Sequence, residues 1–272
     1  MNYNHLYHAG NFADIFKHYI LSLCLNRLKE KDSSFFILDA FAGSGLYPLT
    51  SYAAQTTKEY KNGIEKFMKS NFEDQSLKTF QNLLLPSWNA QIYNGSPLQI
   101  SEQIRLHDRF IANELHSEFY DILLHLLGHH KNIFIKQLDA YESIKAHIPP
   151  PEKRGLILID PPFERRDEFE VLIESLKTWY KKFPQGHYAI WYPIKANDLS
   201  LELNQRAKDI GFHRTYRTEI LRTPREQPHT FNGSGMLLLN APFTVVETLR
   251  TAKDELGQCL QANIEIELLT TE

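Results

Sequence analysis

Residues 155–163 have the sequence Gly-Leu-Ile-Leu-Ile-Asp-Pro-Pro-Phe. Residues 155–159 form an unbroken apolar run, and the acid Asp160, two prolines and an aromatic ring follow it. Such a run, ended by residues that cannot continue a strand, is typical of a parallel strand that is covered on both faces. Parallel strands of this kind belong to α/β proteins, which bind ligands at the carboxyl ends of their strands. We therefore expect Asp160 to lie at a functional site.

The turn after this strand has a specific chemical character. Prolines fix their own φ angles and have no N–H to donate, so the Pro161-Pro162 pair is stiff and its carbonyls point away from a strand ladder. These groups suit a planar substrate that carries N–H bonds, because the ring of Phe163 can stack on its face while the oxygens accept its hydrogens. A simple stop-and-turn signal is the alternative interpretation of Asp-Pro. The tetrapeptide is more specific, since it resembles the [Asp/Asn]-Pro-Pro-aromatic signature of methyltransferases that act on adenine N6, cytosine N4 or a glutamine amide.

A second buried-strand pattern lies upstream and runs into a glycine turn. Residues 35–45 have the sequence Phe-Phe-Ile-Leu-Asp-Ala-Phe-Ala-Gly-Ser-Gly. Glycines at Gly43 and Gly45 would allow a tight bend and a close approach to a cofactor. The fingerprint of nicotinamide-binding proteins needs a third small residue where Pro48 stands, which disfavours an oxidoreductase. The Asp-x-Phe-x-Gly-x-Gly form instead resembles motif I of the enzymes that use S-adenosylmethionine.

Composition places the chain among globular proteins. Its 272 residues, 42% of them hydrophobic, are enough for one sizeable α/β domain with an insertion, or for two small domains; we expect a single domain over residues 1–272. No apolar run approaches the roughly 20 residues that span a bilayer. The N-terminus lacks the regions of a signal peptide, and the two cysteines have no metal or redox spacing. We expect a cytoplasmic protein without a membrane partner.

Charge is distributed unevenly along the sequence. The formal net charge of −3 argues mildly against a nucleic-acid partner, because phosphate binding relies on cations. Residues 211–235 are locally basic, which is compatible with a compact RNA footprint. An ordinary solvated strand face and loop is the alternative interpretation. The arginines of this segment are Arg214, Arg217, Arg222 and Arg225, and its acids are Glu219 and Glu226.

The order of patterns predicts an α/β fold with a doubly wound, mostly parallel sheet of seven strands. The segment 48–93 is polar and helix-prone, and we expect a small helical insertion there, with Phe80 and Trp88 in its own core. Residues 263–272 are a strand or tail to which the sequence assigns no role. Strands are expected at 35–39, 109–113, 133–137, 156–159, 187–193, 214–221 and 235–240, and helices at 13–30, 97–105, 118–127, 167–182 and 199–210.

Four acids fall at or just after the ends of four successive predicted strands. An acid after the second strand is expected to hold a ribose hydroxyl pair. Asp121, His125 and His129 are spaced i, i+4 and i+8, a spacing that can present metal ligands, but leucines surround them and a solvated helix face is the better interpretation. We therefore assign no metal. The acids are Asp39, Glu114, Asp139 and Asp160.

Taken together, these motifs resemble one family, the RlmJ-type 23S rRNA adenine-N6 methyltransferases. The most specific part is residues 3–18, Tyr-x-His-x-x-His-Ala-Gly-Asn-x-Ala-Asp-x-x-Lys-His. The likeness covers essentially the whole chain, the helical insertion included. It continues through the glycine turn, Asn94-Gly95-Ser96-Pro97, Glu114-Leu115-His116, Asp160-Pro161-Pro162, Trp191-Tyr192-Pro193 and Gly233-Ser234-Gly235-Met236.

The resemblance implies a Rossmann-like fold, S-adenosylmethionine as the cofactor, 23S rRNA as the substrate and a site built from named residues. Glu114 would hold the ribose hydroxyls of the cofactor, and Asp139 with Ala140 its adenine. Phe41 stands where relatives have histidine, so its contact would come from the backbone, and Phe163 replaces the commoner tyrosine. The implied cofactor residues are His18, Phe41, Ser96, Glu114, Asp139, Ala140 and Asp160, and the implied substrate residues are Tyr3, Lys17, Pro161 and Phe163.

The chemistry expected of such a site is a direct transfer. Asp160 and the Pro161 carbonyl would accept both hydrogens of the adenine N6 amino group, and Asp160 would take up the proton that the product must lose. The target base would be unstacked and would lie on Phe163. Three alternatives stay open: a DNA adenine-N6 methyltransferase, a protein glutamine-N5 methyltransferase and a noncatalytic RNA-binding module. We expect the protein to act as a monomer.

Overall fold

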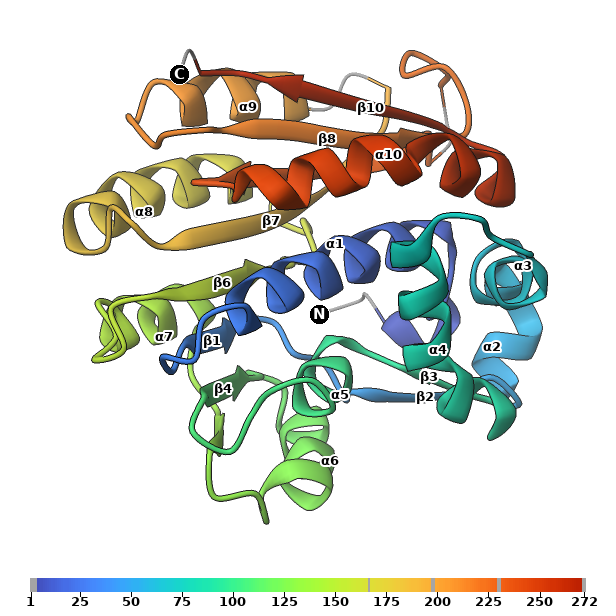
Figure 1. Cartoon of the computed structure of the whole chain (residues 1–272), viewed down its shortest axis with the longest axis horizontal. Helices are drawn as coiled ribbons and strands as arrows, with labels where there is room; N and C mark the ends of the chain where they lie inside the picture. Colours follow the sequence, from blue (N-terminus) through green and yellow to red (C-terminus); the bar gives the residue numbers. More distant parts are fainter. Residues whose placement is uncertain (1–3, 166, 197–198, 229–230, 271–272) are drawn as a thin grey trace.

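The structure is a computed structural model that describes residues 4–165, 167–196, 199–228 and 231–270. Within these residues an eight-stranded sheet has the order β10-β8-β9-β7-β6-β1-β4-β5 (Figure 1). The five strands from β7 to β5 are parallel, whereas β9 is antiparallel to β7 and β8, and β10 is antiparallel to β8. The strands are β1 (Phe36–Asp39), β4 (Arg109–Asn113), β5 (Ile133–Lys136), β6 (Gly155–Ile159), β7 (His187–Ile194), β8 (Tyr216–Leu221), β9 (Gly233–Leu239) and β10 (Asn263–Leu268).

The predicted fold class is confirmed, and the predicted number of strands was wrong by one. The extra strand is β10, which lies in the segment whose role was left open. It is a short edge strand with an alternating pattern and two exposed acids, so its sequence has no continuous apolar run. Only pairing with β8, through the register Ile264 to Ile220, reveals it as part of the sheet.

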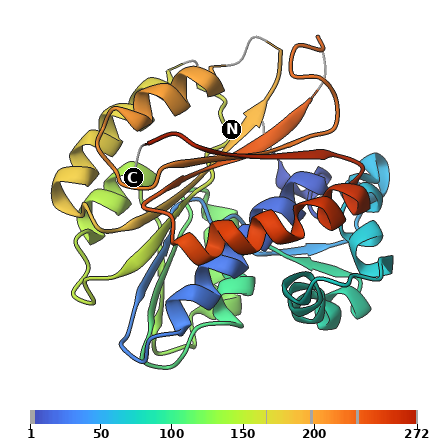
Figure 2. The same cartoon turned by 45° about the horizontal axis from the view of Figure 1, so that its top comes forward.

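Helices cover both faces of the sheet, as Figure 2 shows for α8 and α9 on one side and α1 and α10 on the other. Side chains of successive strand residues point to opposite faces and so build two cores. Phe36 and Leu38 of β1 enter one core, and Ile37 enters the other. The helices of the first face are α1 (Phe12–Lys29), α5 (Ser96–Ser101), α6 (Ser117–Leu127) and α10 (Phe243–Leu260); those of the second are α7 (Ala140–His147), α8 (Glu168–Lys182) and α9 (Ser200–Lys208).

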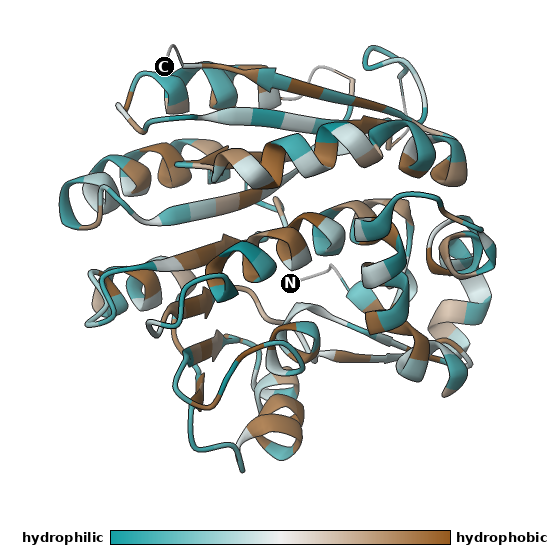
Figure 3. Cartoon of the chain, viewed as in Figure 1, coloured by the Kyte–Doolittle hydropathy of each residue, from teal (hydrophilic) through white to brown (hydrophobic). Residues whose placement is uncertain are grey.

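Helix α1 is buried on nearly every side, as its many hydrophobic residues in Figure 3 suggest. It packs on the sheet and against α10, α5 and α4, so both of its faces need apolar residues. The side chain of Asn11 caps its start by accepting a 3.0 Å hydrogen bond from the N–H of Asp14. The polar residues Asp14, Lys17 and His18 are buried as well, and buried polar groups of this kind need partners.

Residues 48–93 form mainly helices, and a short antiparallel pair of strands, β2 (Leu46–Pro48) and β3 (Ile92–Asn94), joins their two ends. Phe80 and Phe67 pack with ring centroids 5.4 Å apart, and their cluster is continuous with the core under α1. That this segment is an insertion subdomain within one domain of 272 residues stays a prediction. Its helices are α2 (Tyr52–Thr57), η2 (Glu59–Asn62), α3 (Ile64–Lys69) and α4 (Gln75–Asn89), and η1 (His5–Tyr7) precedes α1.

Two helices, α7 and α10, were not predicted. The apolar positions of α10 recur at helical spacing, for example Val245, Leu249, Ala252 and Leu256, so the signal was present in the sequence. Helix α5 ends at Ser101, several residues earlier than expected. Of the helices in the described part of the chain, none combines the length and the apolar character needed to cross a bilayer.

Candidate active site

The carboxyl ends of the parallel strands bring the predicted acids to one edge of the sheet. Asp39 is the last residue of β1 and pairs in register with Leu158 of β6 on one side and Ala112 of β4 on the other. Asp160 follows β6 directly, and Glu114 follows β4 directly. Because neighbouring parallel strands end at the same edge, residues far apart in the sequence meet here.

Lys17 of α1 reaches across to this edge. Its ammonium lies 2.6 Å from Oδ2 of Asp160 and 3.0 Å from Oδ1 of Asp14. Burial of Lys17 favours the neutral amine, but the two carboxylates outweigh it and raise the pKa of Lys17 above its ordinary value. Burial likewise opposes the charge of Asp14, yet His5 and Lys17 lower the pKa of Asp14 well below its ordinary value. The result is a buried chain of alternating charges that ends on Asp160.

Asp39 has the most unusual environment of these acids. It is fully buried, and neither of its carboxylate oxygens has a hydrogen-bond partner of good geometry among the described residues. Burial, assisted by repulsion from Asp160, raises the pKa of Asp39 to about 7, although the nearby Ser96 hydroxyl and the charge of Lys17 oppose the rise. Two unpaired buried oxygens are costly unless something binds them, so Asp39 suits a polar or cationic ligand. The sequence analysis predicted that Asp39 lies at this edge, but it assigned Asp39 no function.

The glycine turn after β1 is tied to the loop after β4. Gly43 and Gly45 have φ angles of 64° and 77°, which favour glycine. The N–H of Gly43 donates to Oε2 of Glu114 over 2.8 Å, and the N–H of His116 donates to its Oε1 over 2.7 Å. Both oxygens of the Glu114 carboxylate therefore accept backbone donors, which holds the side chain in one position at the strand ends.

His18 is buried beside this turn and is uncharged. Burial lowers its pKa well below the ordinary value. Its Nδ1 lies 2.6 Å from the Tyr93 hydroxyl and 3.1 Å from Nε2 of Gln99, which also donates to the Asn94 carbonyl. Because the Gln99 amide nitrogen can only donate, Nδ1 accepts and the proton resides on Nε2. That Nε2 is buried and has no partner in the described residues, so an N–H donor is available to a ligand.

The Asp-Pro-Pro-Phe turn holds Phe163 in an uncommon backbone conformation. Its φ angle is 49°, in the left-handed region that a large side chain rarely adopts. The half-buried ring lies 4.8 Å from the ring of Phe169 and 6.1 Å from that of Trp191, measured between centroids. These contacts keep the ring next to Asp160, and local strain of this kind is often found at functional sites.

Of the remaining predicted cofactor residues, Ser96 is the buried first residue of α5, and the other three lie at or beside the start of α7. Asp139 caps this helix by accepting hydrogen bonds from the N–H groups of Tyr141 and Glu142, and Ala140 is buried. Phe41 is half-buried and meets the ring of Tyr141 edge-on, with centroids 6.3 Å apart. The structure thus places Phe41 on the same side of the sheet edge as α7.

Asn113, which sequence reasoning missed, links the two halves of this edge. Its amide donates to the Ala40 carbonyl over 3.1 Å and to the Leu138 carbonyl over 3.0 Å. It therefore fixes the loop after β1 against the loop that leads to Asp139. Its signal in the sequence was a polar residue at the end of an otherwise apolar strand.

Other predicted features lie elsewhere or are used differently. Tyr3 lies outside the described residues. The basic segment 211–235 is not one patch, because Arg217 pairs with Glu267 and Arg225 pairs with Glu219. Among the described residues no group of three or more His, Cys, Asp and Glu side chains is placed to hold a metal ion.

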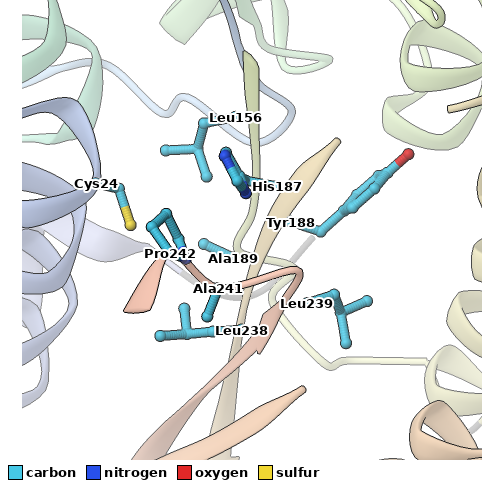
Figure 4. A pocket seen from close by; sticks show the side chains of 9 residues that line it. All are labelled: Cys24, Leu156, His187, Tyr188, Ala189, Leu238, Leu239, Ala241 and Pro242. Carbon is cyan, nitrogen blue, oxygen red and sulfur yellow. The ribbon is translucent and has the colours of Figure 1, made fainter. Parts of the chain in front are cut away.

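A small cavity of about 10 Å³ lies where β6 and β7 begin, at the sheet edge opposite Asp160 (Figure 4). A space of that size holds at most a water molecule. It is therefore not the ligand site. Its lining residues are Cys24, Leu156, His187, Tyr188, Ala189, Leu238, Leu239, Ala241 and Pro242.

Comparison with known proteins agrees with this geometry. Residues 32–266 match the family model described as ribosomal RNA large subunit methyltransferase D, RlmJ. The chain belongs to this family. A Haemophilus influenzae protein named ribosomal RNA large subunit methyltransferase J is 34% identical over 90% of this chain and 89% of its own length. An Escherichia coli protein of the same name is 31% identical over 92% and 90% of the two chains.

The fold of the family is also represented among solved structures. A crystal structure of a Legionella pneumophila protein superimposes with a TM-score of 0.86 and 31% identity, and it covers 96% of this chain and 98% of that one. The family resemblance seen in the N-terminal string and the Asp-Pro-Pro-Phe turn is therefore confirmed. The family description, a methyltransferase of ribosomal RNA, fits a strand-end acid beside a stiff turn and an aromatic ring.

Proposed function

We propose that this enzyme transfers a methyl group from S-adenosylmethionine to the exocyclic N6 of one adenosine in 23S rRNA. The observation that carries the proposal is the contact between Asp160 and an N–H donor. In a chain of the RlmJ family, the carboxylate of Asp160 accepts a 2.6 Å hydrogen bond from a buried ammonium at the carboxyl end of β6. An amino group of a substrate is a donor of the same kind, so Asp160 is built to bind one.

The cofactor would lie over the ends of β1 and β4. Bound S-adenosylmethionine supplies an electrophilic methyl group on a positively charged sulfur. The unpartnered buried groups fit such a molecule, because the Asp39 carboxylate can accept from an ammonium and His18 Nε2 can donate. Glu114 would bind the ribose hydroxyls with its remaining lone pairs. Four further residues would line the rest of the cofactor pocket: Phe41, Ser96, Asp139 and Ala140.

The acceptor base would lie on the β6–α8 side of the same edge. Phe163 would stack on the adenine ring, and Asp160 with the carbonyl of Pro161 would accept the two N6 hydrogens. Two acceptors favour a pyramidal nitrogen, whose lone pair is no longer delocalised into the ring, and they stabilise the positive charge that develops there. Asp160 then accepts the proton that the methylated nitrogen loses. Tyr3 would contact the RNA from the N-terminal segment.

Lys17 has a defined part in this sequence of events. Before the substrate binds, its ammonium satisfies Asp160; when the amino group arrives, Lys17 gives up that contact and stays with Asp14, 3.0 Å away. Asp160 therefore has an N–H donor both before and after the substrate binds. We further propose that the protein acts in the cytoplasm as a single-domain monomer without a metal ion, with residues 48–93 as its helical insertion.

The test uses purified protein, tritium-labelled S-adenosylmethionine and three acceptors: transcribed 23S rRNA, duplex DNA and ribosomal protein. The proposal predicts label in the rRNA alone, and nucleoside mass spectrometry should identify it as N6-methyladenosine. Label in DNA or in glutamine would establish one of the alternative acceptors. Mass spectrometry of rRNA from a deletion strain, which should lack one methyladenosine, checks the result in the cell.

A further inference from the structure

Three strands extend past the edge that carries Asp160. Ile159, the last residue of β6, pairs with Ile190, whereas β7 continues to Ile194, roughly 13 Å beyond that point at ordinary strand rise. Strand β8 reaches the same level, because Ile194 and Leu221 both pair with Gly233 of β9. Residues 222–228 and 231–232, called here the β8–β9 loop, therefore lie beyond the level at which β6 ends, at the ends of β8 and β9 (Figure 1).

The loop also contacts the first turn of α1, the helix that carries Lys17. The guanidinium of Arg222 lies 5.2 Å from the ring centroid of Phe12, and the ring of Phe231 lies 5.6 Å from it. Lys17 lies five residues after Phe12, which is about 8 Å along the helix axis. The ammonium of Lys17 donates to Asp160. Both loop residues are exposed, with Phe231 at 37%. An exposed arginine and an exposed ring thus lie against the helix whose Lys17 contacts Asp160.

A buried polar network fixes the base of this loop. Glu219 of β8 is fully buried and accepts a 2.8 Å hydrogen bond from the Tyr192 hydroxyl of β7. These two residues are two strands apart, and the residue between them in register is Gly235. A Cβ atom at Gly235 would lie 2.1 Å from Cζ of Tyr192. The glycine is therefore what allows the tyrosine ring to cross β9 and reach the acid.

Arg225 connects this network to the loop. Its guanidinium donates to the second oxygen of Glu219 and, over 2.9 Å, to the hydroxyl of Ser200 at the start of α9. Asn232 closes the loop, because its side chain donates to the carbonyls of Arg225 and Gln227 over 2.7 and 2.9 Å. Its own N–H donates to Ile194 at the end of β7 over 2.9 Å. Each end of the loop is thus bonded to a strand end or to α9.

A buried ion pair of this type is weak evidence for stability, because desolvation offsets most of the attraction between the charges. Its best-attested use is to specify one arrangement of the chain among several. Here the arrangement that it specifies is the course of the exposed β8–β9 loop against the first turn of α1. The network uses Tyr192 of Trp191-Tyr192-Pro193 and Gly235 of Gly233-Ser234-Gly235-Met236, two residues to which the catalytic proposal gives no role.

We propose that the β8–β9 loop is an RNA-binding element, in which Arg222 contacts a phosphate next to the target nucleotide and Arg225 is a positioning residue that acts through Glu219. This inference rests on the proposed function, because it takes RNA as the substrate. Arg222 supplies the charge, and a guanidinium binds a phosphate oxygen pair through two parallel N–H groups. Arg225 acts from within the protein, since its two terminal nitrogens donate to Ser200 and Glu219.

The test compares Arg222→Gln, Arg225→Gln and the double variant in steady-state methylation of 23S rRNA. Each single change should raise KM for RNA about tenfold, the effect of one charge-assisted contact, with kcat and the affinity for S-adenosylmethionine within about twofold of wild type. Each should also reduce the slope of log KM against log salt by about 1. Because both act on the same contact, the double variant should be no worse than either single variant.

Three further variants separate positioning from a general loss of stability. Arg225→Lys keeps one bond to Glu219, so it should restore part of the RNA affinity. Arg214→Gln removes an exposed arginine of the same basic segment at the opposite sheet edge, and Arg206→Gln removes an Arg–Glu pair of α9. Both controls should leave KM unchanged.

The outcomes are decisive in either direction. A wild-type KM in Arg222→Gln, or additive effects in the double variant, would overturn the inference even though the enzyme methylates rRNA. The inference would also be overturned if Arg225→Gln lowered kcat and the melting temperature as well as raising KM, and if Arg225→Lys restored none of the three. Failure of wild-type protein to methylate any rRNA would instead refute the proposed function itself.

Discussion

Lys17 Nζ and Asp160 Oδ2 lie 2.6 Å apart, although 143 positions separate the two residues in the chain. The contact joins the first long helix to the turn after β6. In this contact Asp160 accepts from a cationic N–H donor that also lies 3.0 Å from Asp14. An acid held ready in this way can exchange one N–H donor for another without ever losing its partner.

Replacing Asp160 by asparagine should stop methyl transfer without preventing cofactor binding. The amide keeps the shape of the carboxylate but cannot accept the proton, so we expect turnover to fall by about a hundredfold or more. Calorimetric titration should give an affinity for S-adenosylmethionine within a few-fold of wild type. Asp167→Asn, which removes an exposed acid of the same loop, is the matched control. Near-normal turnover of the Asp160 variant would end the proton-acceptor role.

Lys17→Met should destabilise the protein. The change leaves the buried Asp14 with one cation fewer, and breaking a buried pair in this manner typically costs about 3–5 kcal/mol. Denaturant unfolding measures the loss. Lys177→Met removes an exposed pair on α8 and should cost less than about 1 kcal/mol. Equal stabilities of the two variants would show that the Lys17 pair does not hold the fold together.

The stability of the protein should depend on pH through Asp39. The pKa of this carboxyl is about 7 in the folded state against an ordinary value of 3.8, so the folded state binds the proton more tightly than the unfolded chain does. Its contribution to stability is therefore present below about pH 4 and declines as pH rises towards 7, by up to about 4 kcal/mol at 1.4 kcal/mol per unit of pKa shift.

Asp39→Asn should remove this part of the pH dependence. We expect the variant to melt higher than wild type at pH 8 and close to wild type at pH 4.5, in thermal scans across that range. Asp121→Asn, at an exposed position of α6, should reproduce the wild-type curve. Parallel curves for wild type and Asp39→Asn would mean that Asp39 does not titrate in this window.

Phe163→Ala should impair the use of RNA far more than the binding of S-adenosylmethionine. Stacking of a base on an aromatic ring contributes about 1–3 kcal/mol, so KM for RNA or the single-turnover rate should worsen at least several-fold. Phe163→Tyr keeps the stacking face and should be almost silent. Normal modification of rRNA by the alanine variant would show that another residue holds the base.

Much of the fold was visible in the sequence because each central strand carries its own signal. A strand buried on both faces must be apolar throughout, so residues 36–39 and 155–159 reveal themselves without any knowledge of their neighbours. The glycine turn and the prolines are equally local, since φ preferences belong to single residues. These signals predicted the α/β class, the position of Asp160 and the family.

Edge elements and side-chain partners could not be predicted in this way. Strand β10 has no apolar run of its own, and it is a strand only because β8 offers a free edge. The sequence of the basic segment indicates one positive patch. In the structure Arg217 pairs with Glu267 and Arg225 with Glu219, so the charges of these two arginines are balanced.

By itself, then, the sequence determined the central strands, the strand-end acids and the chemistry of the Asp-Pro-Pro-Phe turn, because each depends on residues next to one another in the chain. The tertiary structure alone decided that Lys17 bonds Asp160, that Asp39 and His18 have polar atoms without a partner in the described part of the chain, and that Gly235 lets Tyr192 reach Glu219. Those facts depend on which distant segments pack together, and burial then sets the pKa values and the unmet hydrogen bonds.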